Sequence, residues 1–329
     1  MPGPFSASPG SLVPRSLSYV TTPTPSSVRV LSPSVLVAIA VTVVAWASAF
    51  IVIRGTAPYF TGGAVALGRL VVGTVLLGVV VLIGRRWVWP TRREWIYIAV
   101  FGIAWFGGYN VALNTAEHTI DAGTTSMLVN IGPILIALGA GIFLREGIPK
   151  WLAIGAGVAF VGAIVIWIGT TGGHVSLGLG ILWCLLAALL YSVGVLFQKP
   201  ALKRLPNAQV TWLGCVIGMV VCLPFSGQLV TGLQSAPVGG WVGILYLGAI
   251  PTSLAFSTWA YALSRMPAGQ LGISTYIVPP LAIVLGLIAF GVVPPLLAIV
   301  GGAICLVGVA LSRRRTVVKA VPQVEEVTQ

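Results

Sequence analysis

The sequence contains very little charge, and acidic residues are especially scarce. Of its 329 residues, 7% are charged, with 18 Lys and Arg, 6 Asp and Glu, and 2 His. Soluble domains carry about 25% charged residues, so a soluble fold of this size would lack the polar surface it needs. With 57% hydrophobic residues and a mean hydropathy of +1.02, the composition predicts a polytopic membrane protein of all-α class.

The scarcity of titratable side chains also argues against an enzyme. The acids and histidines fall in expected loops, at helix ends or in the tail: Glu94, Glu117, His118, Asp121, Glu146, His174, Glu325 and Glu326. Of these, we expect Glu117, His118 and Asp121 to form a solvated outer loop rather than a metal site. The four cysteines lie in apolar runs without metal-ligand spacing. No GxxxxGK[ST] motif supports ATP binding. We therefore expect no catalytic residue, metal or cofactor.

Apolar runs account for most of the chain. After residues 1–33, expected to form a disordered cytoplasmic tail, ten runs are each long enough to cross about 30 Å of hydrocarbon. The expected spans are 34–53, 62–83, 95–115, 122–144, 151–168, 177–197, 208–230, 241–262, 270–290 and 295–311, followed by a second cytoplasmic tail at 313–329.

Basic residues predict the orientation of these spans. With the N-terminus inside, 16 Lys and Arg fall in inner segments, whereas Arg54 is alone in the outer loops and Arg69 lies within the second run. This bias predicts a protein of the cell (inner) membrane with both termini in the cytoplasm. It also accounts for the net charge of +12 without nucleic acid as a partner, since no basic and aromatic patch is present.

An internal repeat relates the two halves. A shift of 146 residues without a gap pairs Trp95 with Trp241, Pro133 with Pro279, Pro149 with Pro295, Gly155 with Gly301 and Gly162 with Gly308. Each copy, 34–168 and 177–312, holds five expected spans. Because each copy crosses the membrane an odd number of times, the second copy starts on the opposite side and is inverted relative to the first. Secondary transporters with inverted repeats have this arrangement.

An ordered set of residues resembles a known family. The set comprises WASAF at 46–50, Arg69, Ala116, Ala122, Pro133, LREG at 144–147, Gly155 and Gly162, with the echo Ala262, Ala268, Pro279, Gly301 and Gly308. Together with the repeat, it resembles the EamA-like permeases of the drug/metabolite transporter superfamily. The resemblance implies a permease for a small metabolite, often an exporter of amino acids or drug-like compounds. The acid at Glu146 has no counterpart in the second half, where Val292 stands.

Interrupted helices predict the place of the substrate site. Pro133 and the Pro279-Pro280 pair break equivalent spans, and such breaks are typical of transport sites near the midplane. The residues expected to bind substrate are Asn110, Asn114, Asn130, Ser257, Tyr261, Tyr276, Trp46 and Arg69, with Pro133, Pro279 and Glu146 as kink or gate residues. Two alternatives remain open. The polar groups could instead join helices, and Arg69 could extend to the outer interface.

These observations predict a secondary transporter that works by alternating access on a small-molecule substrate in a lipid bilayer, and the resemblance implies that it acts as an exporter. The alternative is a channel or lipid translocase with the same membrane fold. Rows of small residues, such as Gly214 and Gly218, would serve packing within the bundle or contact in a homodimer.

Overall fold

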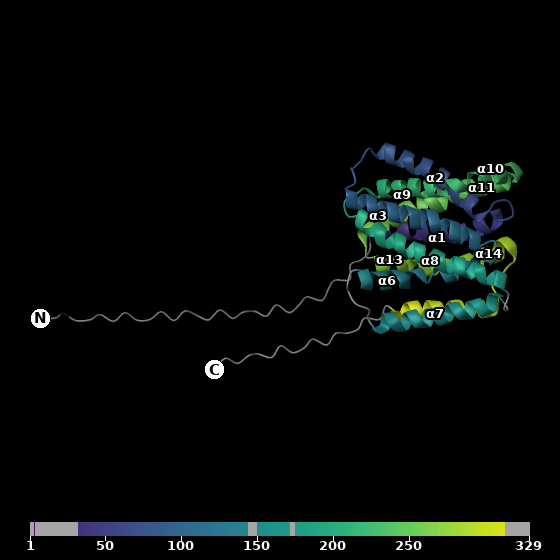
Figure 1. The fold of residues 1–329 in the computed structure, drawn as a ribbon. Coiled ribbons are helices and arrows are strands. Elements are labelled where there is room, and N and C mark those ends of the chain that lie inside the picture. Colours follow the sequence, from purple (N-terminus) through teal and green to yellow (C-terminus); the bar gives the residue numbers. More distant parts are fainter. Residues whose placement is uncertain (1–2, 4–31, 144–149, 172–174, 267, 313–329) are drawn as a thin grey trace. The chain divides into compact units, whose positions relative to one another are not determined.

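A computed structural model describes residue 3 and residues 32–143, 150–171, 175–266 and 268–312, and every regular element among them is helical (Figure 1). The uninterrupted helices are α1 (Pro33–Thr56), α2 (Gly62–Gly84), α7 (Lys150–Thr171), α8 (Val175–Ala201) and α15 (Leu296–Ser312). The other helical segments are divided into shorter pieces.

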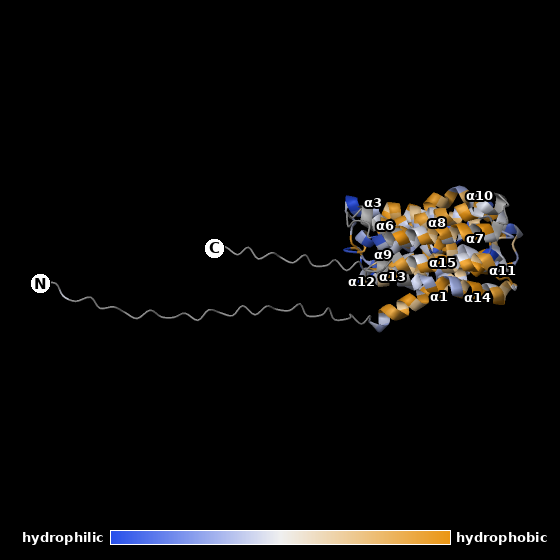
Figure 2. Cartoon of the chain, turned by 90° about the horizontal axis from the view of Figure 1, so that it is seen from below, coloured by the Kyte–Doolittle hydropathy of each residue, from blue (hydrophilic) through white to orange (hydrophobic). Residues whose placement is uncertain are grey.

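The apolar composition of the helices fits a membrane. Six continuous helical stretches in the described part of the chain are long and apolar enough to span a bilayer: Pro33–Thr56, Gly62–Gly84, Arg92–Ala116, Gly178–Ala201, Asn207–Ser235 and Val238–Arg265. Shorter apolar helices account for much of the rest. Figure 2 shows hydrophobic residues along the lengths of the helices and hydrophilic residues near their ends. Large apolar side chains such as Leu82, Phe160 and Ile288 are exposed, as expected of faces that contact lipid.

Two helical stretches contain a widened turn at equivalent positions. A π-helical segment, Gly102–Tyr109, joins α3 (Arg92–Phe101) to α4 (Asn110–Ala116). A second one, Gly248–Leu254, joins α11 (Val238–Leu247) to α12 (Ala255–Arg265). The two begin 146 residues apart, at the spacing of the sequence repeat. Segments of this kind are rare and frequently lie at functional sites.

Two other stretches are broken near the prolines that the repeat pairs. The first contains α5 (Ala122–Val129), a break at Asn130 and Ile131, and α6 (Gly132–Phe143). The second contains α13 (Ala268–Ser274), a 3-10 turn (Thr275–Ile277) and α14 (Val278–Phe290). Pro133 and Pro279 both lie in the first turn of the piece that follows the break, where the missing proline N–H is not needed.

Glycines allow α7 and α15 to pack backbone against backbone. A Cβ atom at Gly162 would lie 2.7 Å from the carbonyl oxygen of Gly301, and one at Gly308 would lie 2.6 Å from that of Gly155. Both views in Figures 1 and 2 place the two helices together. The small residues noted in the sequence therefore provide a contact within the bundle.

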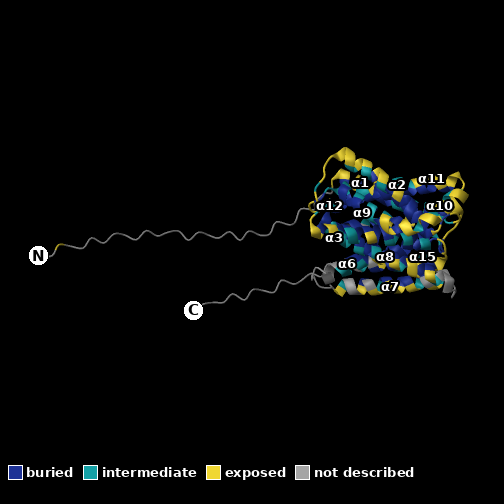
Figure 3. Ribbon diagram, turned by 45° about the horizontal axis from the view of Figure 1, so that its top comes forward, coloured by how far each residue is buried: buried dark blue, intermediate teal, exposed yellow. Residues whose placement is uncertain are grey.

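The interior lies around α1. This helix packs against α12, α14 and α11, while α9 (Asn207–Cys222) packs against α2 and the first π segment. The remaining pieces are a 3-10 turn (Leu223–Phe225) and α10 (Ser226–Ser235). Figure 3 shows buried residues in the interior and exposed residues on the outer faces and ends. Unusually for a core, the interior also holds buried polar side chains, including Arg69, Asn110, Asn114 and Glu117.

Candidate functional site

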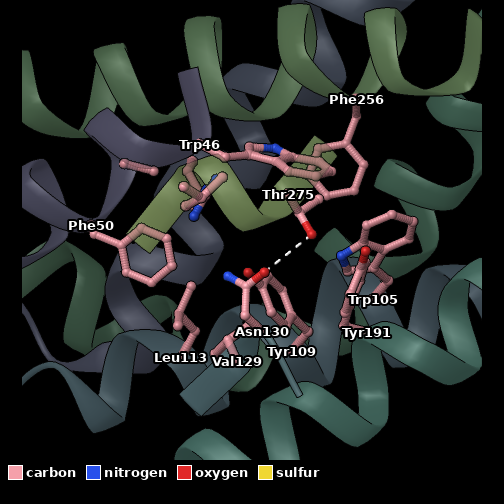
Figure 4. A pocket seen from close by; sticks show the side chains of 13 residues that line it. Trp46, Phe50, Trp105, Tyr109, Leu113, Val129, Asn130, Tyr191, Phe256 and Thr275 are labelled. Atoms are coloured by element: carbon pink, nitrogen blue, oxygen red, sulfur yellow. Dashed lines mark hydrogen bonds between the residues drawn. The ribbon is translucent and has the colours of Figure 1, made fainter. Parts of the chain in front are cut away.

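A cavity lies in the interior, where α1, α2, α8, both π-containing stretches and both broken stretches meet (Figure 4). Its aromatic lining residues are Trp46, Phe50, Trp105, Tyr109, Tyr191 and Phe256, its aliphatic ones Ala49, Leu113, Val129 and Val278, and its polar ones Arg69, Asn130 and Thr275. The free volume is about 50 Å³, which holds a few water molecules. We call it the central cavity.

One wall of the central cavity is a cluster of aromatic rings around Trp46. Its ring centroid lies 6.0 Å from that of Trp105, 5.6 Å from that of Phe256 and 5.0 Å from that of Trp259. The indole N–H of Trp46 donates to the carbonyl oxygen of Pro251 at 3.3 Å. Pro251 belongs to the second π segment, so the widened turn holds Trp46 in place from the other half of the chain.

Arg69 is the only cation among the described residues that line the central cavity, and it lies well inside the bundle. Its side chain comes from α2, and the residue is 3% exposed. The Nε atom donates to the hydroxyl of Thr252 at 2.9 Å, and that hydroxyl donates to the carbonyl oxygen of Leu247 at 2.7 Å. Arg69 therefore points toward the second half of the chain and the cavity, rather than to the outer interface. Among the described residues, no acid lines the cavity with it.

The two helix breaks contact each other across the cavity. The hydroxyl of Thr275 donates to the amide oxygen of Asn130 at 3.2 Å, as Figure 4 shows. The amide nitrogen of Asn130 donates to the carbonyl oxygen of Ser126 at 3.0 Å, a group near the end of α5. Asn130 therefore links one broken stretch to the other and leaves its side chain at the cavity surface.

Asn110 and Asn114 are buried but do not line the cavity. The amide of Asn110 donates to the carbonyl oxygens of Phe106 at 2.8 Å and Trp105 at 3.2 Å, which stabilises the first π segment. The amide of Asn114 donates to the carbonyl oxygen of Gly62 at 3.1 Å and so joins α4 to the start of α2. In both residues the side-chain oxygen is buried without a hydrogen bond. The contact of Asn114 is therefore one that joins two helices, whereas those of Asn110 stay within its own helical stretch.

The other polar residues expected at the site lie away from the cavity. Tyr261 donates to the hydroxyl of Ser34 at 3.0 Å, and the guanidinium of Arg265 covers its ring at 3.5 Å from the centroid. Tyr276 packs beside Ile134.

Ser257 lies on α12 and is half-buried, outside the cavity lining. Pro133 and Pro279 are buried at their helix breaks, and neither lines the cavity. Glu146 lies outside the described residues.

The expectation of a solvated outer loop is wrong for Glu117. This residue directly follows the stretch Arg92–Ala116, is fully buried, and has two carboxylate oxygens without a hydrogen-bond partner. Burial raises the pKa of its carboxyl well above the usual range, while the nearby charge of Arg54 acts in the opposite direction. The sequence contained a usable signal, because the position 146 residues later is Leu263, an apolar residue that is fully buried.

A second cavity opens at the same end of the bundle as Glu117. Its lining comes from the end of α1 with Arg54, from the start of α5 with its cap Asp121, and from α14 and the residues that follow it, including Pro294. Its volume is about 370 Å³. We call it the outer cavity. Asp121 caps α5 by accepting from the backbone N–H of Thr124 at 2.8 Å. Within the described part of the chain no group of three His, Cys, Asp or Glu is placed to hold a metal ion.

Thr252 and Thr275 are site residues that sequence reasoning missed. Thr252 holds Arg69, and Thr275 holds Asn130. The repeat pairs Thr275 with Val129, 146 residues earlier, and both line the cavity. Equivalent positions of the two halves therefore face the same space. Thr252 lies in a π segment. The direction of its side chain therefore does not follow from the periodicity of an α-helix.

Comparison with known proteins identifies transporters as relatives of this chain. The EamA-like transporter family matches this chain twice, at residues 33–168 and 178–314. A probable terminal-alkyne amino-acid exporter of Streptantibioticus cattleyicolor is 36% identical over 282 residues, covering 85% of this chain and 93% of that protein. The uncharacterized transporter YdfC of Bacillus subtilis is 30% identical over 272 residues, covering 81% and 87%.

The fold is also similar to that of a solved protein. One crystal structure shares 19% sequence identity and superimposes with a TM-score of 0.59, covering 85% of this chain and 96% of the other. The two family matches, the curated transporters and the apolar helices agree with one another. The chain is therefore a multi-pass membrane transporter, and not an enzyme, that belongs to the EamA-like transporter family.

Proposed function

We propose that the protein is a secondary transporter that exports a small amphipathic carboxylate, such as an amino acid with a short apolar side chain. The observation that carries the proposal is the central cavity, where one buried cation, Arg69, faces an aromatic wall. A guanidinium binds a carboxylate through two parallel hydrogen bonds. An apolar side chain would then pack against Trp46 and Phe256.

An amino acid would also bring an ammonium group. The faces of Trp46 and Trp105 attract such a cation, and the amide oxygen of Asn130 can accept a hydrogen bond from it. The similarity to a probable terminal-alkyne amino-acid exporter supports this substrate class, because such an amino acid combines a zwitterion with a short apolar chain.

We propose ten spans in two inverted repeats, with both termini in the cytoplasm and the chain in the cell (inner) membrane. Alternating access would then rock one repeat against the other. Three hydrogen bonds made by residues of the central cavity cross between the repeats: Arg69 to Thr252, Thr275 to Asn130 and Trp46 to Pro251. Because the free volume of about 50 Å³ holds only a few water molecules, binding of an amino acid requires the aromatic wall to move.

Counterflow in proteoliposomes tests the proposal. Vesicles loaded with L-norvaline should accumulate labelled L-norvaline transiently, which a carrier does and an open channel does not. Arg69→Met should abolish this accumulation, since the carboxylate loses its partner. Arg265→Met, which removes an exposed cation at the end of α12, should keep it. Flux that does not saturate would favour the channel alternative, and equal transport by both variants would refute the site.

A reporter fusion tests the orientation. An alkaline phosphatase domain attached after Lys319 should stay inactive, because that enzyme folds only outside the cytoplasm, and a fluorescent protein at the same place should be bright. The opposite pair of results would remove the basis for two inverted repeats of five spans each.

A further inference from the structure

Glu117 is the most unusual buried group outside the central cavity. It is 0% exposed, and neither carboxylate oxygen has a hydrogen-bond partner. Arg54 approaches it, yet the guanidinium of Arg54 donates to the backbone carbonyl oxygen of Glu117 rather than to the carboxylate. An ionised carboxylate without partners is very costly in such a place, so a buried acid of this kind holds a proton.

Glu117 lies between the two cavities. Arg69 and Tyr109, which interact electrostatically with Glu117, line the central cavity, and Arg54 and Asp121, which also do so, line the outer cavity. Glu117 itself is fully buried and is not among the described lining residues of either cavity, so it is coupled to both through these neighbours. No other acid in the described part of the chain has this combination, because Glu94 pairs with Arg204 and Asp121 caps a helix.

Several elements contribute titratable or charged groups around Glu117. Those that interact with it are Arg54 of α1, Arg69 of α2, Tyr109 of the first π segment, Asp121 of the following turn and Cys184 of α8, and His118 is its neighbour in the chain. Burial, and next the charge of Arg54, lower the pKa of His118, so this imidazole is neutral near neutral pH. The two arginines are thus the cations that a charged Glu117 would attract.

We propose that Glu117 is a proton-binding residue of the transport cycle, protonated while Arg69 binds a substrate carboxylate and deprotonated when that carboxylate leaves. In the release step the O–H bond of Glu117 breaks, and the proton passes to water in the outer cavity. The new carboxylate then attracts Arg69 and weakens its hold on the substrate. The substrate part of this inference rests on the function proposed above, whereas the proton site does not.

The proposal fixes the sign of the pH dependence. The Glu117 carboxylate and the substrate carboxylate compete for the guanidinium of Arg69. Protonation of Glu117 removes its charge, so it strengthens substrate binding, and bound substrate in turn favours protonated Glu117. Affinity for a carboxylate should therefore increase as pH falls. A coupling of one pKa unit corresponds to about tenfold in affinity.

The first experiment needs no substrate. Infrared difference spectra of the full-length protein in lipid nanodiscs, recorded as the pH is raised, should contain a protonated-carboxyl band near neutral pH that Glu117→Gln removes. Glu117→Asp should move the band and its titration midpoint, and Glu94→Gln, which removes an acid paired with Arg204 and not among the groups acting on Glu117, should leave both unchanged. A wild-type spectrum that matches that of Glu117→Gln would overturn the proposal, and Glu117→Asp provides the same test if the first variant does not fold.

The second experiment measures coupling. L-Norvaline should bind the wild-type protein about tenfold more tightly at low than at high pH, and Glu117→Gln should bind tightly at both. A pH dependence that survives in Glu117→Gln would overturn the coupling. If no L-norvaline binds although the infrared band titrates as described, the proposed substrate class is wrong and the proton site stands.

Discussion

The close packing of α7 against α15 makes Gly162 intolerant of even one methyl group. A Cβ at this position would lie 2.6 Å from the backbone nitrogen of Cys305 and 2.7 Å from the carbonyl oxygen of Gly301. Both neighbours are backbone atoms of the facing helix, so no side-chain rotation relieves the clash. We therefore expect Gly162→Ala to push the helices apart.

The same helix provides a matched control. A Cβ at Gly157 meets no atom within 4 Å. Both substitutions replace a glycine within α7, so the gain in helix propensity, up to about 1 kcal/mol, is common to the two variants. The difference between them then reflects the clash, which typically costs about 1–3 kcal/mol.

Thermal unfolding in detergent, followed by tryptophan fluorescence, measures this difference. Gly157→Ala should unfold at or above the wild-type midpoint, and Gly162→Ala well below it. Gly301→Ala should behave like Gly162→Ala, because its Cβ would lie 2.7 Å from the carbonyl oxygen of Gly162. If Gly162→Ala is as stable as Gly157→Ala, the helices do not pack through these glycines.

Three further predictions follow from other contacts. Asn130→Leu should abolish counterflow at normal protein levels, whereas Tyr276→Leu should retain it, because only Asn130 lines the cavity; the reverse result would move the site. Arg204→Gln should lower the midpoint of thermal unfolding only slightly, because exposed ion pairs contribute little to stability and the Arg204 side chain is 47% exposed; a large drop would show that the pair holds the fold. The pKa of Glu117 is higher in the folded than in the unfolded protein, where it is about 4.3. The free energy of unfolding should therefore decrease as pH increases from about 4.3 to the folded pKa. If Glu117→Gln shows the same decrease with pH, Glu117 is not its cause.

Sequence patterns located the helices well, because a helix that crosses the hydrocarbon core needs a run of about 20 apolar residues. The expected span 62–83 corresponds to Gly62–Gly84, and 34–53 to Pro33–Thr56. The repeat also pointed to Pro133 and Pro279, and each lies in the first turn after a helix break. These features depend on local composition and backbone chemistry, which a single sequence carries.

Side-chain directions were predicted less well, because α-helical periodicity was applied across π segments. Ser257 and Tyr261, both expected to bind substrate, lie four residues apart, and Ser253 lies four residues before Ser257. Ser253 lies inside the second π segment, where backbone hydrogen bonds run over five residues instead of four, and its hydroxyl donates to the carbonyl oxygen of Gly248 at 2.9 Å. The wider turn breaks the interval of four, so a face predicted across it is not continuous.

Burial of Glu117 was missed for a different reason. An acid one residue beyond an apolar run is normally solvated, and only tertiary packing distinguishes the exceptions. The structure surrounds this carboxyl with α1, α2 and α8, which are far apart in the sequence. Only the apolar residue at the related position, Leu263, hinted at that environment.

The two π segments also affect how this chain tolerates changes in length. Removing one residue from an ordinary spanning helix rotates everything after it by about 100° relative to what precedes it. A π segment already carries an extra residue in its turn, so a one-residue deletion within Gly102–Tyr109 or Gly248–Leu254 can be absorbed as that turn narrows to an α-helical one. Each half of the protein therefore contains one place, beside the central cavity, where evolution can shorten a membrane helix and keep its two ends facing the same neighbours.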